Sequence, residues 1–164
     1  MIADALYAIE MSVVALIAYW SAFFAFAQAS STTSNTIGAL WATISAIFVF
    51  REHRADSVSA AGSRLLASCF SAALCLIYLL LFPPSLAGMA IVIAVGTVLL
   101  LRAQRHGEIA TTAITTAVVM VVAVVEPRHA WHQPLLRLAD SVIGIVIGTA
   151  ANWLASFVFE RVRS

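Results

Sequence analysis

Residues 135–159 read LLRLADSVIGIVIGTAANWLASFVF, a long apolar run that carries one polar stripe. A helix needs roughly 20 apolar residues to cross the ~30 Å hydrocarbon core of a bilayer, and this run is long enough. At about 100° per residue, a helix places Arg137, Asp140, Gly144, Gly148 and Asn152 within about 120° of one another. Charged and amide side chains cost a few kcal/mol each in lipid, so we expect this stripe to face a protein interior or a wet cavity.

Similar apolar runs occur throughout the chain, with 62% hydrophobic against 10% charged residues, which excludes an ordinary water-soluble globule. We predict an all-α polytopic membrane bundle, a single transmembrane domain over residues 1–164. The charged residues 51–56 are predicted to form a loop, and Pro83 and Pro84 a sharp reversal. The six predicted transmembrane helices cover about residues 5–27, 36–50, 59–82, 86–101, 109–125 and 135–159.

The distribution of arginines predicts the orientation, because cytoplasmic loops carry an excess of basic residues. The chain has no lysine, and seven arginines fall on one side of the predicted layout against two on the other. Both termini are therefore expected in the cytoplasm. The net charge of +1 provides no field that would attract nucleic acid. The seven are Arg51, Arg54, Arg64, Arg102, Arg105, Arg161 and Arg163, and the two are Arg128 and Arg137.

A shift of 73 residues aligns the third predicted helix with the sixth. Each begins with an arginine and then has small residues at spacings of three and four, which permits close helix approach. We interpret this as two inverted three-helix repeats, since a unit with an odd number of spans returns in the opposite orientation. The matched residues are Arg64, Leu65, Ser68, Ser71 and Cys75 with Arg137, Leu138, Ser141, Gly144 and Gly148.

Two groups of charged residues within the apolar runs have both a functional and a structural interpretation. Arg137 offers a planar guanidinium fork to a carboxylate, or it pairs with Asp140 to hold the sixth helix in place. Glu10 lies inside the first predicted helix as a possible proton carrier, or at the cytoplasmic interface if that helix begins later.

The sequence gives little indication of metal, redox or enzymatic chemistry. His129 and His132 have a spacing that metal ligands use, but we interpret them as solvent-exposed loop residues, and Cys69 and Cys75 as small packing residues. There is no phosphate-binding glycine loop, and no nucleophile, base and orienting group occur together. We therefore expect no metal, no cofactor and no enzymatic activity.

Two stretches resemble the membrane domain of the fusaric acid resistance and aromatic acid exporter proteins. One is residues 38–47, GALWATISAI, followed by Ser57 and Arg64; the other is residues 137–145, RLADSVIGI. Where that family usually has a Gly-Thr pair and a further glycine, this chain has Ala67, Ser68 and Ser71. The resemblance spans most of the chain and implies export of small, mostly aromatic carboxylates. Longer members have a second membrane half, so it also implies a homodimer or higher oligomer here.

The leading hypothesis is therefore a multi-pass exporter of small organic anions in the inner (plasma) membrane, with the lipid bilayer and the anion as its partners. Two alternatives are a passive organic-anion channel and a membrane scaffold or accessory subunit without a pathway. Glu10 is the predicted proton-coupling residue. The predicted substrate-binding residues are Arg64, Arg137, Asp140, Trp41, Asn152 and Trp153.

Overall fold

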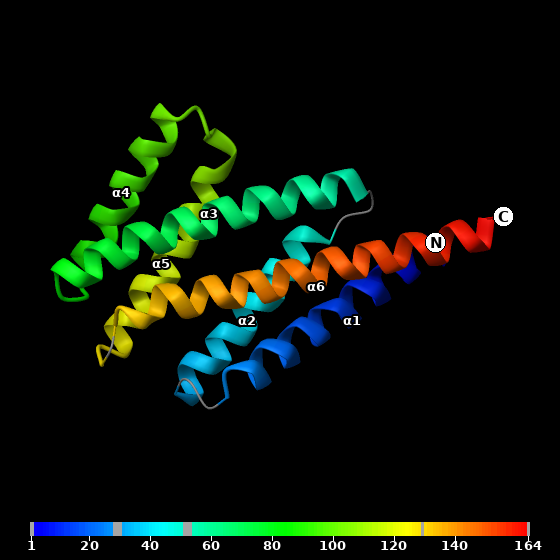
Figure 1. Cartoon of the computed structure of the whole chain (residues 1–164), viewed down its shortest axis with the longest axis horizontal. Coiled ribbons are helices and arrows are strands. Elements are labelled where there is room, and N and C mark those ends of the chain that lie inside the picture. Colours follow the sequence, from blue (N-terminus) through cyan, green and yellow to red (C-terminus); the bar gives the residue numbers. More distant parts are fainter. Residues whose placement is uncertain (1, 28–30, 51–53, 129, 164) are drawn as a thin grey trace. The chain divides into compact units, whose positions relative to one another are not determined.

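The computed structural model describes residues 2–27, 31–50, 54–128 and 130–163, and in these ranges the fold is all-helical, as predicted. Six α-helices are described, with a short 3-10 helix, η1 (His106–Glu108), before the fifth (Figure 1). The α-helices are α1 (Ile2–Ala25), α2 (Thr32–Val49), α3 (Arg54–Leu81), α4 (Leu86–Arg102), α5 (Ile109–Val125) and α6 (His132–Arg163).

Several helices begin earlier than predicted, for identifiable local reasons. The backbone N–H of Ser34 donates to Ser31 Oγ over 3.1 Å, so this serine caps α2 and the polar residues after it are helical. The prediction of a loop over residues 51–56 is wrong from Arg54 onward, where α3 has begun. Asp56 in the first turn of α3 suits the positive end of the helix dipole.

Four of the described helices contain segments that are long and apolar enough to cross a membrane, by length and composition. These segments are Ala5–Ala25, Asp56–Leu81, His106–Val125 and His132–Ala155. The helix α4 is apolar but has only 17 residues, and α2 opens with polar residues. The prediction of six spans thus stays a prediction for α2 and α4.

The described helices fall into two compact units, of which unit 1 comprises Met1–Gly62 and Asp140–Ser164. In it α1 and α2 form a hairpin with α6 beside it (Figure 1). The Asn35 side chain donates to the Phe23 carbonyl over 3.0 Å, and Thr43 Oγ1 lies 3.4 Å from the Ala15 carbonyl. Small residues, including Ala18, Ala22, Ala42 and Ala46, fill the core between the helices.

Unit 2 comprises Ser63–Ala139 and contains α4, α5 and most of α3. Its core joins side chains of all three helices, including Cys75, Val92, Val119 and Met120. Gly88 of α4 packs directly under the Tyr78 ring, and Tyr78 Oη lies 3.2 Å from Ser85 Oγ. The Ser85 hydroxyl also accepts from the Gly88 N–H, so it caps α4 immediately after the double proline.

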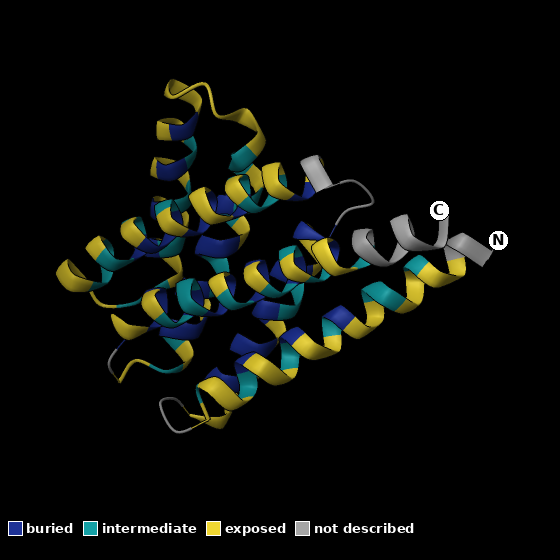
Figure 2. Ribbon diagram, turned by 45° about the vertical axis from the view of Figure 1, so that its right-hand side comes forward, coloured by how far each residue is buried: buried dark blue, intermediate teal, exposed yellow. Residues whose placement is uncertain are grey.

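Figure 2 shows exposed residues along the described helices, and many of these exposed residues have large apolar side chains. On α1 they recur every three or four residues, as expected of one helical face. Water would not favour such a face, whereas lipid hydrocarbon accepts it at no cost. The exposed residues of this α1 face are Leu6, Ile9, Val13, Leu16, Ile17, Trp20 and Phe24.

Candidate functional site

The polar stripe of α6 is buried along its whole length. Arg137 and Asp140 are each 2% exposed, and Asn152, three turns later, is also buried. Both glycines of the stripe are buried as well. The prediction that this face avoids lipid is therefore confirmed. The stripe lies within His132–Ala155, one of the segments long enough to span a membrane.

Within unit 1, the glycines of the stripe bring the backbones of α6 and α2 together. A Cβ atom built on Gly144 would overlap the Ala42 carbonyl oxygen, and one built on Gly148 would lie 2.7 Å from the Ala46 carbonyl oxygen. Both contacts advance by four residues in the same direction, so α2 and α6 run parallel. Small residues at this spacing are the usual basis of close helix packing in membranes.

A second stripe in unit 2 begins at Arg64, which is 4% exposed although it lies inside the apolar segment Asp56–Leu81. Ser68, Ser71 and Cys75 continue the same face of α3 at spacings of three and four. Ser71 Oγ and Thr116 Oγ1 share a hydrogen bond of 2.9 Å, and Cys75 belongs to the core that includes Met120. The stripe that starts at Arg64 therefore faces α5.

The remaining predicted site residues differ in their exposure and in the unit to which they belong. Trp41 is buried on α2, but Trp153 is 51% exposed on α6, one position from the buried Asn152. Glu10 is half-buried on α1, within the segment Ala5–Ala25. Arg64 and Arg137 belong to unit 2, and the other five predicted residues belong to unit 1. The boundary between the two units therefore falls within α6, between Arg137 and Asp140.

A set of buried hydroxyl groups on α5 was not predicted from the sequence. Thr112, Thr115 and Thr116 are all buried, and Thr112 and Thr116 are one turn apart. The signal was present, because polar residues four apart in an apolar run mark one face of a helix. Asn35 and Gln133 are further buried polar residues that were not singled out.

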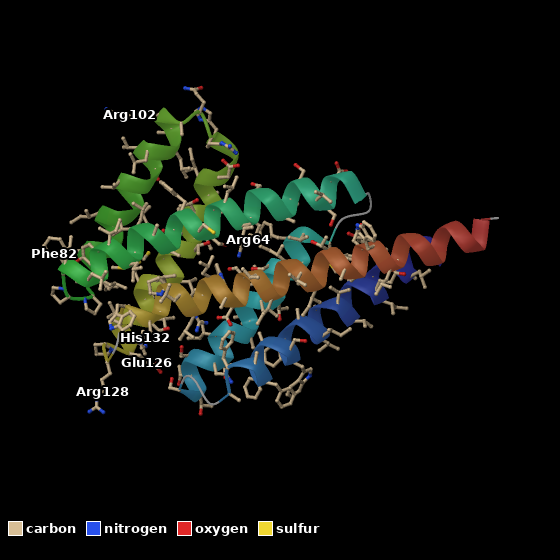
Figure 3. All side chains as sticks on the ribbon, viewed as in Figure 1. Arg64, Phe82, Arg102, Glu126, Arg128 and His132 are labelled. Carbon is tan, nitrogen blue, oxygen red and sulfur yellow. The ribbon has the colours of Figure 1, made fainter. Side chains whose placement is uncertain are left out.

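Unit 2 also contains a cavity of about 370 Å³ where the turn after α3 meets the turn after α5. Its lining is apolar and includes aromatic and proline rings, among them Phe82, Pro84, Pro127 and Trp131. Figure 3 shows Phe82 and His132 at this end of the unit, with Arg128 extending away from the ribbon. The cavity offers flat surfaces but no charged side chain in its lining.

No cluster of three or more metal-ligating side chains occurs in the part of the chain that the structure describes. His129, one of the two histidines considered above, lies outside the described residues. Cys69 and Cys75 are both free thiols. Cys75 packs in the core as predicted, whereas the same prediction is wrong for Cys69, which is exposed.

A comparison with protein families gives a match that covers most of the chain. The family model described as fusaric acid resistance protein-like matches residues 17–151, which include both buried stripes except Asn152. No curated protein and no solved structure matches the chain. The family is a transport family, not an enzymatic one. The chain belongs to the fusaric acid resistance protein-like family of membrane transport proteins.

Proposed function

We propose that this protein exports small organic anions, above all aromatic carboxylates, across the inner (plasma) membrane. The observation that carries the proposal is the burial of Arg137, at 2% exposure, in an apolar segment long enough to span a bilayer. An arginine there costs several kcal/mol unless it lines a protein interior or a wet path. Its guanidinium fork matches the two oxygens of a carboxylate. Asp140 and Asn152 on the same stripe supply further polar lining.

The proposal includes six spans with both termini in the cytoplasm. A chain that crosses the membrane at every helix alternates in direction, so even-numbered helices run one way and odd-numbered helices the other. The parallel contacts of α2 with α6 support this alternation. The contacts of α3 with α5 and with η1 directly before it also support the alternation, because residue 71 contacts residue 116 and residue 63 contacts residue 108. At 17 residues α4 is about 25 Å long, close to the hydrocarbon thickness.

The packing inside the two units supports an inverted repeat. A shift of 73 residues aligns α1 and α2 of unit 1 with α4 and α5 of unit 2. The same shift aligns α3, most of which lies in unit 2, with α6, most of which lies in unit 1. It also carries the contact of Gly148 with Ala46 onto the pair Cys75 and Val119, which share one core cluster. This correspondence of one packed pair in each unit supports the proposed repeat. In this proposal Arg64 and Arg137, which begin the two matched helical stretches, lie near opposite mouths of the pathway.

Other parts of the chain take supporting roles in this proposal. Trp41 and Trp153 offer ring faces to the aromatic part of the substrate. Glu10 couples export to protons, since an acidic side chain within a span is suited to carry them. The half-exposed Trp153 fits a pathway completed by a second copy of the chain. A homodimer would assemble as many helices as a member with two membrane halves.

The proposed function is tested by flux through the purified protein in liposomes. Labelled benzoate should leave the vesicles with saturable kinetics above the leak of empty vesicles. Unlabelled aromatic carboxylates should compete, whereas benzamide, the uncharged analogue, should not, because a buried guanidinium discriminates by charge.

Each of the other possible results would contradict the proposal in a different way. Equal competition by benzamide would contradict recognition of the anion. Flux that simply follows the benzoate gradient, with no proton movement, would indicate a passive channel. Folded protein without flux for any carboxylate would indicate an accessory subunit.

A further inference from the structure

Two buried hydroxyl groups of unit 2 behave unlike most others in the helices. Helical serine and threonine usually bond to the carbonyl one turn earlier, as five described residues here do: Ser12, Thr36, Thr43, Thr115 and Thr149. Ser68 Oγ and Thr112 Oγ1 are buried and make no hydrogen bond to any described residue. The two residues are 1% and 3% exposed. Buried hydroxyls without a partner are uncommon, and they point to a ligand or water.

The register of α3 against α5 places these two hydroxyls at the same level. Ser71 Oγ on α3 lies 2.9 Å from Thr116 Oγ1 on α5. Ser63, two turns earlier on α3, lies 3.5 Å from the Oε1 atom of Glu108, the last residue of η1 and the residue directly before α5. The two contacts advance in the same direction, so α3 and α5 are parallel. Ser68 and Thr112 each lie about one turn before their helix's member of the Ser71–Thr116 hydrogen bond.

Arg64 lies one further turn along the same face of α3. It is buried, and Ser68, four residues later, is its neighbour on the helix surface. Figure 3 shows Arg64 on α3, well separated from Arg102 at the end of α4. One positive charge and two hydroxyl donors thus share one face of unit 2.

We propose that Ser68 and Thr112 complete a carboxylate-binding site with Arg64 between α3 and α5. The guanidinium binds the carboxylate, and the two hydroxyls donate to it in place of the water that it loses on entering the membrane. The Ser71–Thr116 hydrogen bond closes the site on the side away from Arg64. This inference rests on the proposed function and assigns two binding residues that neither the resemblance nor the polar stripe of α6 had indicated.

The chemistry of the site favours an anion over a cation. The positive charge of Arg64 would repel a cation, because repulsion between like charges is strong in a low-dielectric interior. A carboxylate can accept from the guanidinium and from both hydroxyls at once, since its two oxygens offer about four acceptor positions.

Equilibrium binding of labelled benzoate to the purified protein in detergent tests this site without requiring transport. The variants S68A and T112V should each weaken binding by roughly tenfold, the usual effect of removing one hydrogen bond to a charged group. T112S, which keeps the hydroxyl, should bind like the wild type. T115V is the matched control, because Thr115 is equally buried but bonds locally to the Thr111 carbonyl over 2.8 Å.

The outcomes separate this site from the proposed function. If the wild type binds benzoate and the S68A and T112V variants bind it equally well, the proposed site is overturned. Its hydroxyls would then hold only water, and the exporter proposal would still stand. Weakening by T115V as large as by T112V would mean general damage to α5 and would also overturn it. Absence of benzoate binding in folded wild-type protein would overturn both proposals. Unfolding midpoints of all variants should match within a few degrees.

Discussion

At the scale of single residues, Asn35 illustrates how a buried amide stabilises a hairpin in this apolar chain. The last four carbonyl groups of a helix have no partner within that helix. The Phe23 carbonyl, near the end of α1, instead accepts from the Asn35 side chain of α2 over 3.0 Å. The same bond also gives the buried Asn35 amide a partner. Because it joins one position of α1 to one position of α2, it helps to fix the register of the two helices.

We predict that Asn35→Ala lowers the free energy of unfolding by about 1–2 kcal/mol, since it leaves a carbonyl without its donor. Thr36→Ala is the neighbouring control, because Thr36 is exposed and bonds only within its own helix. That control should change stability by less than about 0.5 kcal/mol. Denaturant unfolding in detergent micelles measures both. Equal stability of the two variants would show that this bond does not hold the hairpin.

Residue burial was predictable from sequence where charge was involved and less so elsewhere. Arg64, Arg137 and Asp140 are buried because charged groups within apolar spans have few other stable positions. The exposure of Trp153 could not be predicted in this way, since an aromatic ring is stable in lipid or in protein. The sequence did not predict that the Ser68 and Thr112 hydroxyls lack a local partner, because a helical hydroxyl usually bonds to a carbonyl of its own helix.

At the scale of elements, the α2–α6 contact depends on the absence of a side chain at Gly144. A Cβ atom there would overlap the Ala42 carbonyl oxygen and lie 2.8 Å from Ser45 Cβ. Backbone atoms cannot move aside as a flexible side chain can. The helices would have to separate, which would also weaken the contact at Gly148.

Gly144→Ala should therefore destabilise the protein by about 1–3 kcal/mol. Gly62→Ala is the matched control, because a Cβ atom there would meet nothing within 4 Å. In the control, alanine should add up to about 1 kcal/mol of stability through its higher helix propensity. Thermal unfolding of the two purified variants distinguishes these opposite shifts. A Gly144→Ala protein as stable as Gly62→Ala would contradict close packing of α2 on α6.

The positions of helices were predictable from hydropathy, but their ends depended on local chemistry. Ser31 caps α2, so the polar residues after it are helical although their composition suggested a loop. Arg54 and Asp56 were assigned to a loop because they are charged, yet charged residues are compatible with the first turn of a helix. By contrast, α4 begins at Leu86 directly after the double proline, where it was expected.

At the scale of the whole molecule, the grouping of helices was harder to predict than the helices themselves. Sequence order suggested units of the first three and the last three helices. Contacts instead group α1 and α2 with α6, and α3 with α4 and α5. The reason is that small residues on α3 and α6 select partners that are distant in sequence. The offset of 73 residues nevertheless relates the two groups, because it aligns α3, which belongs to the second group, with α6, which belongs to the first.

The central claim is that the buried Arg137 guanidinium holds the transported anion. Its most direct test is saturable benzoate flux from liposomes that contain equal amounts of folded wild type, Arg137→Gln, Arg137→Lys or Arg128→Gln. Arg128 is exposed, so it controls for the loss of one positive charge at the same end of unit 2. We predict that Arg137→Gln lowers the ratio kcat/KM by at least roughly tenfold, with a smaller loss for Arg137→Lys, which keeps the charge but not the fork. Arg128→Gln should stay within about twofold of the wild type, because exposed charges are screened by salt. Wild-type flux through folded Arg137→Gln protein would contradict the claim.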